Sequence, residues 1–323
     1  MQKAIETLFE TPFEADVYKG LNDNPKHLSS KYFYDEKGDK LFQDIMHMPE
    51  YYLTDCEFDI LSRHTAEIAH LFAQGKPRFK LIELGAGDGK KTKIVLKYLT
   101  QHGYEFKYQP IDISQNVLDG LEKSLHKELP GLTIEPEQGT YFDALKKINE
   151  ENGTKKIILF LGSNIGNLLH PQAIEFMRNV HDLMHYDDLF FVGFDMKKNP
   201  QTILDAYNDK TGITEAFNKN VLVRINEELG GNFDIDKFLH WEVYDPETGT
   251  AKSYLVAKEA HTVYIEKLDS KVSFNAWETI HTEISQKYDE ATVHRLAEKS
   301  GFKIEHEFSD ADGFYTDYVF RKK

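Results

Sequence analysis

The chain has 323 residues, a formal net charge of −15 and an isoelectric point near 5.4. Hydrophobic residues make up 40% and aromatic residues 13% of the sequence, which is too rich in core-forming side chains for a disordered protein. Because phosphate contacts need clustered Lys and Arg, an acidic chain without a basic block argues against a nucleic-acid partner. The length allows one large domain or two modest ones.

The cysteine content and the apolar runs indicate a soluble enzyme or small-molecule binder. Cys56 is the only cysteine, so no internal disulfide can form and a reducing compartment is expected. No apolar run approaches the roughly 20 residues that span a bilayer, and acids stand near the N-terminus where a signal peptide is apolar. We therefore expect a cytoplasmic protein with no membrane partner.

Helices and strands alternate through the first part of the chain. In chain order we predict a helix at 58–74, a strand at 79–84, a helix at 90–101, a strand at 108–113, a helix at 114–129, a strand at 132–135, a strand at 157–161, a helix at 171–184 and a strand at 189–194. Five strands interleaved with helices predict a doubly wound, parallel α/β sheet. Ligands of such a sheet bind at the carboxyl ends of its strands.

The pattern changes after Met196. We predict helices over 200–230, antiparallel strands over 237–285, a helix at 290–300 and two closing strands at 302–308 and 313–321. The change divides the chain into a sheet domain and a second lobe with α+β character. The sheet domain comprises residues 60–196 and 286–323, and the lobe comprises residues 1–59 and 197–285.

A glycine-rich turn, Gly85-Ala-Gly87-Asp-Gly89, follows the first strand and precedes a helix. Glycines let the backbone approach a ligand closely, and a helix N-terminus favours a carboxylate or phosphate. The spacing is G-x-G-x-G and not the dinucleotide fingerprint G-x-G-x-x-G. A tight turn without a ligand is the alternative interpretation.

Three charged residues surround this turn. Glu83 precedes the first glycine, and Asp112 ends the second strand, where a carboxylate can accept hydrogen bonds from ribose hydroxyls. Lys91, in the first turn of the helix, can reach a ligand carboxylate. Together these features resemble the S-adenosylmethionine site of Rossmann-like methyltransferases. The resemblance implies a Rossmann-like doubly wound methyltransferase sheet with S-adenosylmethionine as cofactor, and a second lobe for the substrate.

Five separated segments carry a more specific resemblance. They are Lys31-Tyr-Phe-Tyr34-Asp35, Pro49-Glu-Tyr51-Tyr52, Leu159-Phe-Leu-Gly-Ser163-Asn164-Ile-Gly-Asn167-Leu168, Ala216-Phe-Asn-Lys-Asn-Val-Leu222 and Thr282-Glu283-Ile-Ser285. With these segments in this order, the chain resembles the histidine Nα-methyltransferase family, whose members make trimethylhistidine on the way to ergothioneine. The resemblance implies methylation of the α-amino group of L-histidine to the trimethylated betaine.

The resemblance also implies roles for individual residues. The cofactor site is lined by Gly85, Gly87, Lys91, Asp112, Thr140 and Tyr141. The amino-acid substrate is held by Tyr34, Tyr51, Asn167, Tyr207, Glu283 and Ser285. Within the second set, Asn167 and Tyr207 bind the carboxylate and amino groups, Glu283 and Ser285 hold the imidazole, and Tyr34 lies beside the ring.

Residue chemistry supports the imidazole assignment independently. Glu283 and Ser285 are two apart on a predicted strand and therefore point to the same face. A carboxylate next to a hydroxyl can pair with both nitrogens of an imidazole. The alternative for Glu283 is a solvated acid on an edge strand. We assign no general base, because a nearby sulfonium lowers the pKa of the attacking amine.

Several positions depart from the family pattern. Thr140-Tyr141 stands where Asp-Phe is common, so that the acid for the adenine amine is missing, and Asp143 or the Thr140 hydroxyl are its substitutes. Asn164 replaces a small hydroxyl residue and Gln286 replaces a cysteine, both expected next to the substrate. Two alternatives therefore stay open: the same chemistry on another amino acid or histidine derivative, and a non-catalytic sensor that binds the cofactor.

One histidine pair has the spacing of a metal site. His181 and His185 are four apart on a predicted helix. They have no intervening glutamate at the required position and no third ligand in the sequence pattern. We therefore predict no metal.

Overall fold

The structure is a computed structural model that describes residues 9–76, 78–149 and 154–323. The chain folds into two compact units. The lobe unit extends to Tyr52 and resumes from Lys198 to Ser285, and the sheet unit comprises Leu53–Lys197 and Gln286–Lys323. The sequence led us to place the first boundary after residue 59. The structure places it after Tyr52, because Leu53–Arg63 is a continuous helix that packs against the last strand of the sheet.

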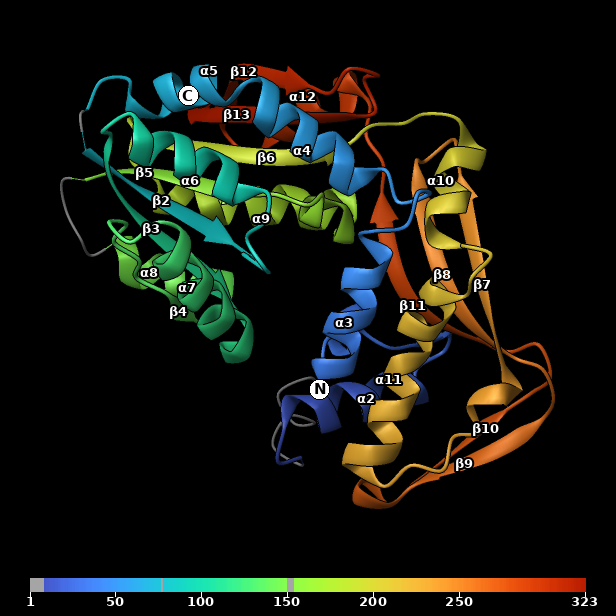
Figure 1. The fold of residues 1–323 in the computed structure, drawn as a ribbon. Coiled ribbons are helices and arrows are strands. Elements are labelled where there is room, and N and C mark those ends of the chain that lie inside the picture. Colours follow the sequence, from blue (N-terminus) through green and yellow to red (C-terminus); the bar gives the residue numbers. More distant parts are fainter. Residues whose placement is uncertain (1–8, 77, 150–153) are drawn as a thin grey trace. The chain divides into compact units, whose positions relative to one another are not determined.

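The sheet unit is built on a seven-stranded sheet (Figure 1). Its strands are β2 (Arg78–Leu84), β3 (Glu105–Asp112), β4 (Glu137–Gln138), β5 (Lys155–Phe160), β6 (Leu189–Asp195), β12 (Phe302–Ser309) and β13 (Tyr315–Lys322). The spatial order is β12-β13-β6-β5-β2-β3-β4, with β2 to β6 parallel and β13 antiparallel to both its neighbours. The chain starts at a central strand and winds outwards in both directions, which confirms the predicted doubly wound sheet.

Helices cover both faces of this sheet. They are α4 (Leu53–Arg63), α5 (Thr65–Ala73), α6 (Thr92–Gln101), α7 (Gln115–Glu128), α8 (Tyr141–Asn149), α9 (His170–Leu183) and α12 (Glu290–Lys299), with the short 3-10 helix η2 (Asn164–Asn167). Helices α4, α5 and α6 contact one another, and α8, α9 and α12 form a second contacting group. Alternate residues of β5 reach the two layers: Ile158 lies in a core with α9, whereas Leu159 lies with residues of α5.

Two predicted elements of this unit were wrong in detail. The single helix expected over 58–74 is broken at His64, whose backbone leaves the helical conformation between α4 and α5. The strand expected over 132–135 is reduced to an isolated bridge between Ile134 and Tyr108, and the strand beside β3 is instead β4. The first error is a break within an expected helix and the second is a strand that shortens to one bridge, and hydrophobic periodicity indicates neither.

The lobe unit combines helices with a second, smaller sheet. Its helices are α2 (Pro12–Asn22), α3 (Glu36–Ile45), α10 (Pro200–Tyr207) and α11 (Ile213–Leu229), with the 3-10 helices η1 (Ser30–Phe33), η3 (Ile235–Lys237) and η4 (Glu266–Leu268). Its strands are β1 (Lys26–His27), β7 (Phe238–Asp245), β8 (Thr250–Ala257), β9 (His261–Ile265), β10 (Ser270–Phe274) and β11 (Thr279–Gln286). The sheet order is β1-β11-β8-β7, and β9 pairs with β10 as a separate hairpin.

Helix α11 connects three of the segments on which the family resemblance depends. The Asn220 amide donates to the Phe33 carbonyl (3.0 Å) and to the Asp35 carboxylate (2.9 Å). The Asn218 amide oxygen accepts a hydrogen bond from the Thr282 hydroxyl on β11 (2.8 Å). Both asparagines are buried. The segments around residues 33, 218 and 282 are therefore joined by hydrogen bonds within one unit.

Across residues 9–76, 78–149 and 154–323, no helix has both the length and the apolar content that crossing a bilayer requires.

Replacing Asn220 by alanine tests the structural role of these bonds. The change leaves the buried Phe33 carbonyl without its amide donor, and we expect it to lower the free energy of unfolding by about 1–3 kcal/mol. Urea denaturation followed by circular dichroism measures this loss. Glu227→Ala, on the exposed face of the same helix, is the matched control and should shift stability by less than about 0.5 kcal/mol. Equal stabilities of the two variants would contradict this role for Asn220.

Candidate functional site

The glycine-rich turn after β2 has the backbone conformation that glycine permits. Gly85 and Gly87 have φ of +74° and +54°, and the Gly85 N–H donates to the Ile111 carbonyl (2.8 Å). A β-carbon on Gly85 would lie 2.9 Å from the Tyr141 hydroxyl, whereas one on Gly87 would meet nothing within 4 Å. The first glycine therefore permits a close contact with Tyr141, and the second borders open space.

Asp112 lies across this turn at the end of β3. Its carboxylate accepts hydrogen bonds from the backbone N–H of Gly87 (3.3 Å) and of Ser114 (3.0 Å), which fix its orientation. Each carboxylate oxygen has the capacity to accept a further hydrogen bond. A half-buried, oriented acceptor beside open space suits a ribose diol, so that these residues fit the adenosine part of S-adenosylmethionine.

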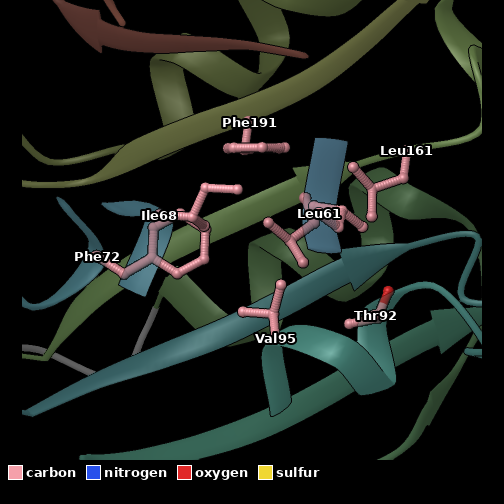
Figure 2. A pocket seen from close by; sticks show the side chains of 8 residues that line it. Leu61, Ile68, Phe72, Thr92, Val95, Leu161 and Phe191 are labelled. Atoms are coloured by element: carbon pink, nitrogen blue, oxygen red, sulfur yellow. The ribbon is translucent and has the colours of Figure 1, made fainter. Parts of the chain in front are cut away.

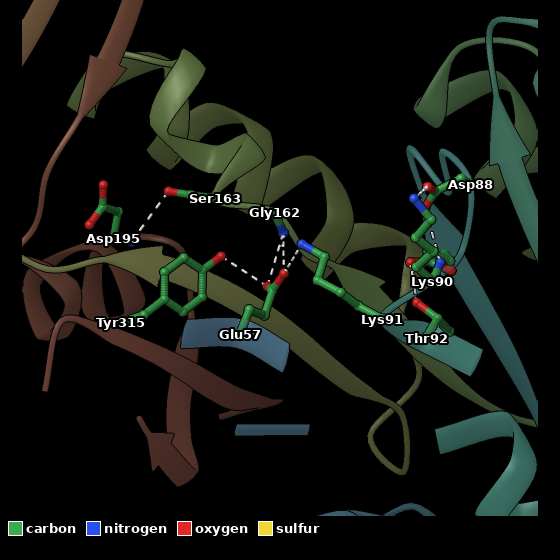
Figure 3. Close-up of polar contacts among 10 residues, drawn as sticks. Glu57, Asp88, Lys90, Lys91, Thr92, Gly162, Ser163, Asp195 and Tyr315 are labelled. Carbon is green, nitrogen blue, oxygen red and sulfur yellow. Dashed lines mark hydrogen bonds and ion pairs between the residues drawn. The ribbon is translucent and has the colours of Figure 1, made fainter. Parts of the chain in front are cut away.

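Lys91 forms an ion pair with Glu57, a buried residue of α4 that the sequence analysis did not single out (Figure 3). Burial alone would lower the pKa of Lys91, but the Glu57 carboxylate outweighs it and holds this pKa above its ordinary value. The Lys91 ammonium lies 3.7 Å from the position that a β-carbon on Gly162 would occupy. The lysine is thus a fixed cation beside the turn that follows β5.

Thr140 and Asp143, the two substitutes that the sequence analysis left open for the adenine contact, bind each other. The Thr140 hydroxyl donates to the Asp143 carboxylate (2.7 Å), and both side chains lie at the surface or close to it. Burial, and then the charge of Asp112, raise the pKa of Tyr141 to about 12, so that its hydroxyl is a permanent donor at neutral pH. Its ring packs edge-on against Phe160.

Glu83 faces the interior and does not line the turn. Its buried carboxylate accepts hydrogen bonds from the Thr92 hydroxyl (2.5 Å) and from the Tyr108 hydroxyl. Burial raises the pKa of Glu83 to about 7, although both hydrogen bonds oppose the rise. Glu83 therefore joins β2, β3 and the start of α6 beneath the turn.

The raised pKa makes stability depend on pH. Because Glu83 keeps its proton to a higher pH in the native protein than in the unfolded chain, the native state loses stability as pH rises from about 5 to about 7. Glu83→Gln removes this titration. The unfolding free energy of the variant minus that of the parent protein should therefore rise from pH 5 to pH 7. Urea denaturation at pH 5, 6, 7 and 8 measures it, with the exposed Glu227→Gln as control. A difference that stays constant from pH 5 to 8 would contradict the raised pKa.

The segment after β5 makes a strained turn on the same edge of the sheet. Ser163 has φ of +55°, a conformation that costs a non-glycine residue about 1–3 kcal/mol, and its hydroxyl accepts the Asp195 N–H (3.3 Å). The Asn164 amide nitrogen lies 3.2 Å from the β-carbon position on Gly85. Asn164 is therefore a neighbour of the glycine turn, and its expected position beside the substrate stays a prediction. Asn167 ends η2 and is exposed.

In the lobe unit, three of the proposed substrate residues lie together. The hydroxyls of Tyr207 and Ser285 are 2.7 Å apart, and both side chains are buried. The ring of Tyr51 lies 6.2 Å from that of Tyr207, centroid to centroid, and nearly perpendicular to it. Phe42 contacts both Tyr34 (5.6 Å) and Tyr51 (6.4 Å). Phe42 is a contact that the sequence analysis missed.

Glu283 belongs to a group of polar side chains on neighbouring strands. Its carboxylate lies 3.5 Å from the Ser253 hydroxyl on β8, which donates to Glu242 on β7 (2.5 Å). Neither Ser253 nor Glu242 was predicted from the sequence as a site residue. Their pairing could have been found from the Asp245–Gly249 turn, because a hairpin there places residue 242 opposite residue 253.

Two further features do not match a ligand site. A small cavity in the sheet unit is lined by Leu61, Phe72, Phe191 and other apolar side chains (Figure 2), and its one polar lining residue, Thr92, is bonded to Glu83. Among the residues that the structure describes, no three His, Cys, Asp or Glu side chains are grouped to hold a metal ion. The His181 ring packs on Phe302 instead.

Comparisons with known proteins show one consistent similarity. Residues 13–322 match the family described as "Histidine-specific methyltransferase, SAM-dependent". The chain is 35% identical over 299 residues to the histidine N-alpha-methyltransferase of Mycolicibacterium smegmatis, covering 92% of this chain and 91% of that protein. It is 34% identical to the Mycobacterium tuberculosis protein of the same name, covering 84% and 83%. It is 30% identical to ergothioneine biosynthesis protein 1 of Schizosaccharomyces pombe, covering 92% of this chain and 39% of that protein.

Proposed function

Because the chain belongs to the histidine-specific, S-adenosylmethionine-dependent methyltransferase family, we propose that it methylates the α-amino nitrogen of L-histidine three times, to the trimethylated betaine. As a member of this family the protein is an S-adenosylmethionine-dependent amino-acid N-methyltransferase. The identity of the amino acid, the number of transfers and the residue roles below are the proposal. The similarity to two proteins named histidine N-alpha-methyltransferase supports them.

The cofactor residues bind and orient the methyl donor. S-adenosylmethionine supplies an activated methyl group: an amine attacks the methyl carbon in line, the carbon–sulfur bond breaks, and S-adenosylhomocysteine is the leaving group. Asp112 accepts hydrogen bonds from the ribose hydroxyls, and the Thr140–Asp143 pair receives the adenine amine. The Lys91 ammonium binds the carboxylate of the donor's amino-acid end. The open space beside Gly87 leaves room for the ligand.

The substrate residues recognise an imidazole and an amino acid. The observation that carries this assignment is the buried hydroxyl pair of Tyr207 and Ser285, with Glu283 two residues earlier on β11. The Ser285 hydroxyl and the Glu283 carboxylate bind the two ring nitrogens, one of which must donate a proton. Asn167 and Tyr207 bind the substrate's carboxylate and amino groups.

The reaction needs a neutral amine and yields a permanent cation. A free α-amino group is mostly charged at neutral pH, and each methyl transfer yields an ammonium again, so that one proton must leave before each of the three transfers. We assign these protons to water or a tyrosine oxygen and not to a dedicated base. The aromatic faces of Tyr34 and Tyr51 stabilise the trimethylated nitrogen by cation–π contact.

The two departures from the family pattern at Asn164 and Gln286 do not change the proposed substrate, which remains histidine. Asn164 lies beside Gly85, and the buried Gln286 amide donates to the Lys287 carbonyl (3.0 Å). Neither side chain takes the place of Glu283 or Ser285. Because one relative is named for ergothioneine biosynthesis, we place the product on a route to ergothioneine. The single cysteine, Cys56, fits a cytoplasmic location.

Mass spectrometry of a defined reaction tests the proposed function. Purified protein is incubated with S-adenosylmethionine and each of the twenty amino acids in turn. We expect histidine alone to gain methyl groups, with mono-, di- and trimethylated species appearing in that order. Modification of another amino acid would overturn the substrate assignment, and no modification at all would favour the sensor alternative.

Separate binding measurements test the residue roles. We expect Glu283→Gln to weaken histidine binding by about tenfold or more, because a charged hydrogen-bond partner is lost, and to leave S-adenosylmethionine binding unchanged. Isothermal titration calorimetry measures both. Glu278→Gln is the matched control, since Glu278 precedes β11 and pairs with Lys26. Equal histidine affinities of the two variants would remove Glu283 from the site.

A further inference from the structure

A fully buried carboxylate, Glu57, connects three parts of the sheet unit. It forms an ion pair with Lys91 at the start of α6, and its oxygens accept the backbone N–H of Gly162 after β5 (2.9 Å). The Tyr315 hydroxyl on β13 donates to it as well (2.9 Å). Its exposed fraction is 0%. Figure 3 shows Tyr315, Gly162 and Lys91 converging on this carboxylate.

A second buried acid, Asp317, interacts with Glu57 from β13. Neither of its carboxyl oxygens has a hydrogen-bond donor among the residues that the structure describes, and its exposed fraction is 0%. Burial raises the pKa of Asp317 well above its ordinary value, and the Glu57 carboxylate raises it further, while Lys91 opposes the rise. Burial and the nearby Glu57 carboxylate therefore favour the neutral acid form of Asp317 over its charged form.

We propose that Glu57 is a positioning residue for the methyl donor: it holds the Lys91 ammonium and the Gly162 turn in place, so that Lys91 presents its remaining N–H donors to the donor's carboxylate. The inference rests on the proposed role of Lys91. An ammonium has three donors, and Glu57 uses at least one of them. Lysine has a flexible four-carbon side chain, and fixing it in advance lowers the entropy lost on binding.

The raised pKa of Asp317 is part of this arrangement. One ionised acid balances the charge of Lys91, whereas two would make the cluster net negative and repel an incoming carboxylate. The neighbouring ion pair of Lys287 and Asp195 (2.6 Å) is also fully buried and balanced. Protonation of Asp317 therefore reduces the negative charge beside the Lys91 ammonium and favours the approach of a ligand carboxylate.

Binding of two ligands distinguishes a positioning role of Glu57 from a general effect of Glu57 on the stability of the fold. S-adenosylhomocysteine carries the amino-acid carboxylate, and 5′-methylthioadenosine lacks it while keeping the adenosine part. We expect Glu57→Gln to weaken S-adenosylhomocysteine binding by about tenfold or more and methylthioadenosine binding by less than about twofold. Calorimetric titration of the purified full chain gives both affinities, and a thermal melt confirms that the variant is folded.

Asp188→Asn is the matched structural control. Asp188 is another buried carboxylate of the sheet unit that accepts two backbone N–H groups, those of Lys156 and His185 (2.7 Å each), and pairs with a lysine ammonium (3.4 Å). It stands near the start of β5, whereas Glu57 bonds to the turn after that strand. We expect this variant to leave the ratio of the two ligand affinities unchanged even where it lowers the melting temperature.

Lys91→Met distinguishes failure of the inference from failure of the proposed function. If Lys91→Met weakens S-adenosylhomocysteine selectively and Glu57→Gln does not, Glu57 is not a positioning residue, and the role of Lys91 stands. If neither variant changes the ratio, the role of Lys91 is wrong as well. Should Glu57→Gln fail to fold, Tyr315→Phe is the substitute variant, because it removes one hydrogen-bond donor to Glu57. We expect it to lower the affinity for S-adenosylhomocysteine relative to that for methylthioadenosine, by a smaller factor than Glu57→Gln. An unchanged ratio of the two affinities then overturns the inference.

Discussion

The carboxyl ends of the parallel strands are the constraint on which the cofactor site depends. The backbone leaves β2 and β5 through turns that contain Gly85 and Gly162, both with positive φ. Since β3 lies next to β2, Asp112 ends beside the first of these turns and bonds to Gly87. Each proposed contact with the methyl donor thus follows from a strand end. The buried carboxylates of Glu83 and Glu57 stabilise these turns through hydrogen bonds from Thr92 and Gly162, respectively.

In the lobe unit, buried polar side chains are stabilised by hydrogen bonds within a largely apolar interior. The asparagines of α11 bind the backbone and side chains of segments far away in the sequence, including Phe33 and Thr282. Aromatic rings from Phe42, Tyr51 and Tyr207 continue from this core towards Ser285. Some of the residues on which the family resemblance depends therefore join distant segments by hydrogen bonds, and others are proposed to contact the ligand.

The sequence predicted the sheet and its glycine turn, because a strand, a glycine-rich turn and a helix in succession leave few alternatives. It could not predict that Glu57 meets Lys91, because that pairing depends on how α4 packs against the sheet, and the expected helix began one residue after Glu57. Nor could it predict that the Asn164 amide lies beside Gly85, because sequence order does not specify which way a turn directs a side chain. The break at His64 arises from local backbone geometry that helical periodicity does not reveal.

The position of the methyl groups on the product is the most direct test of the account. If Glu283 and Ser285 hold the imidazole while Asn167 and Tyr207 hold the amino-acid end, then only the α-nitrogen is presented for methylation. Nuclear magnetic resonance of the purified product, with the amount of S-adenosylhomocysteine formed, measures both position and number. We expect three equivalent methyl groups on the α-nitrogen and three S-adenosylhomocysteine molecules per histidine. A methyl group on a ring nitrogen would contradict it.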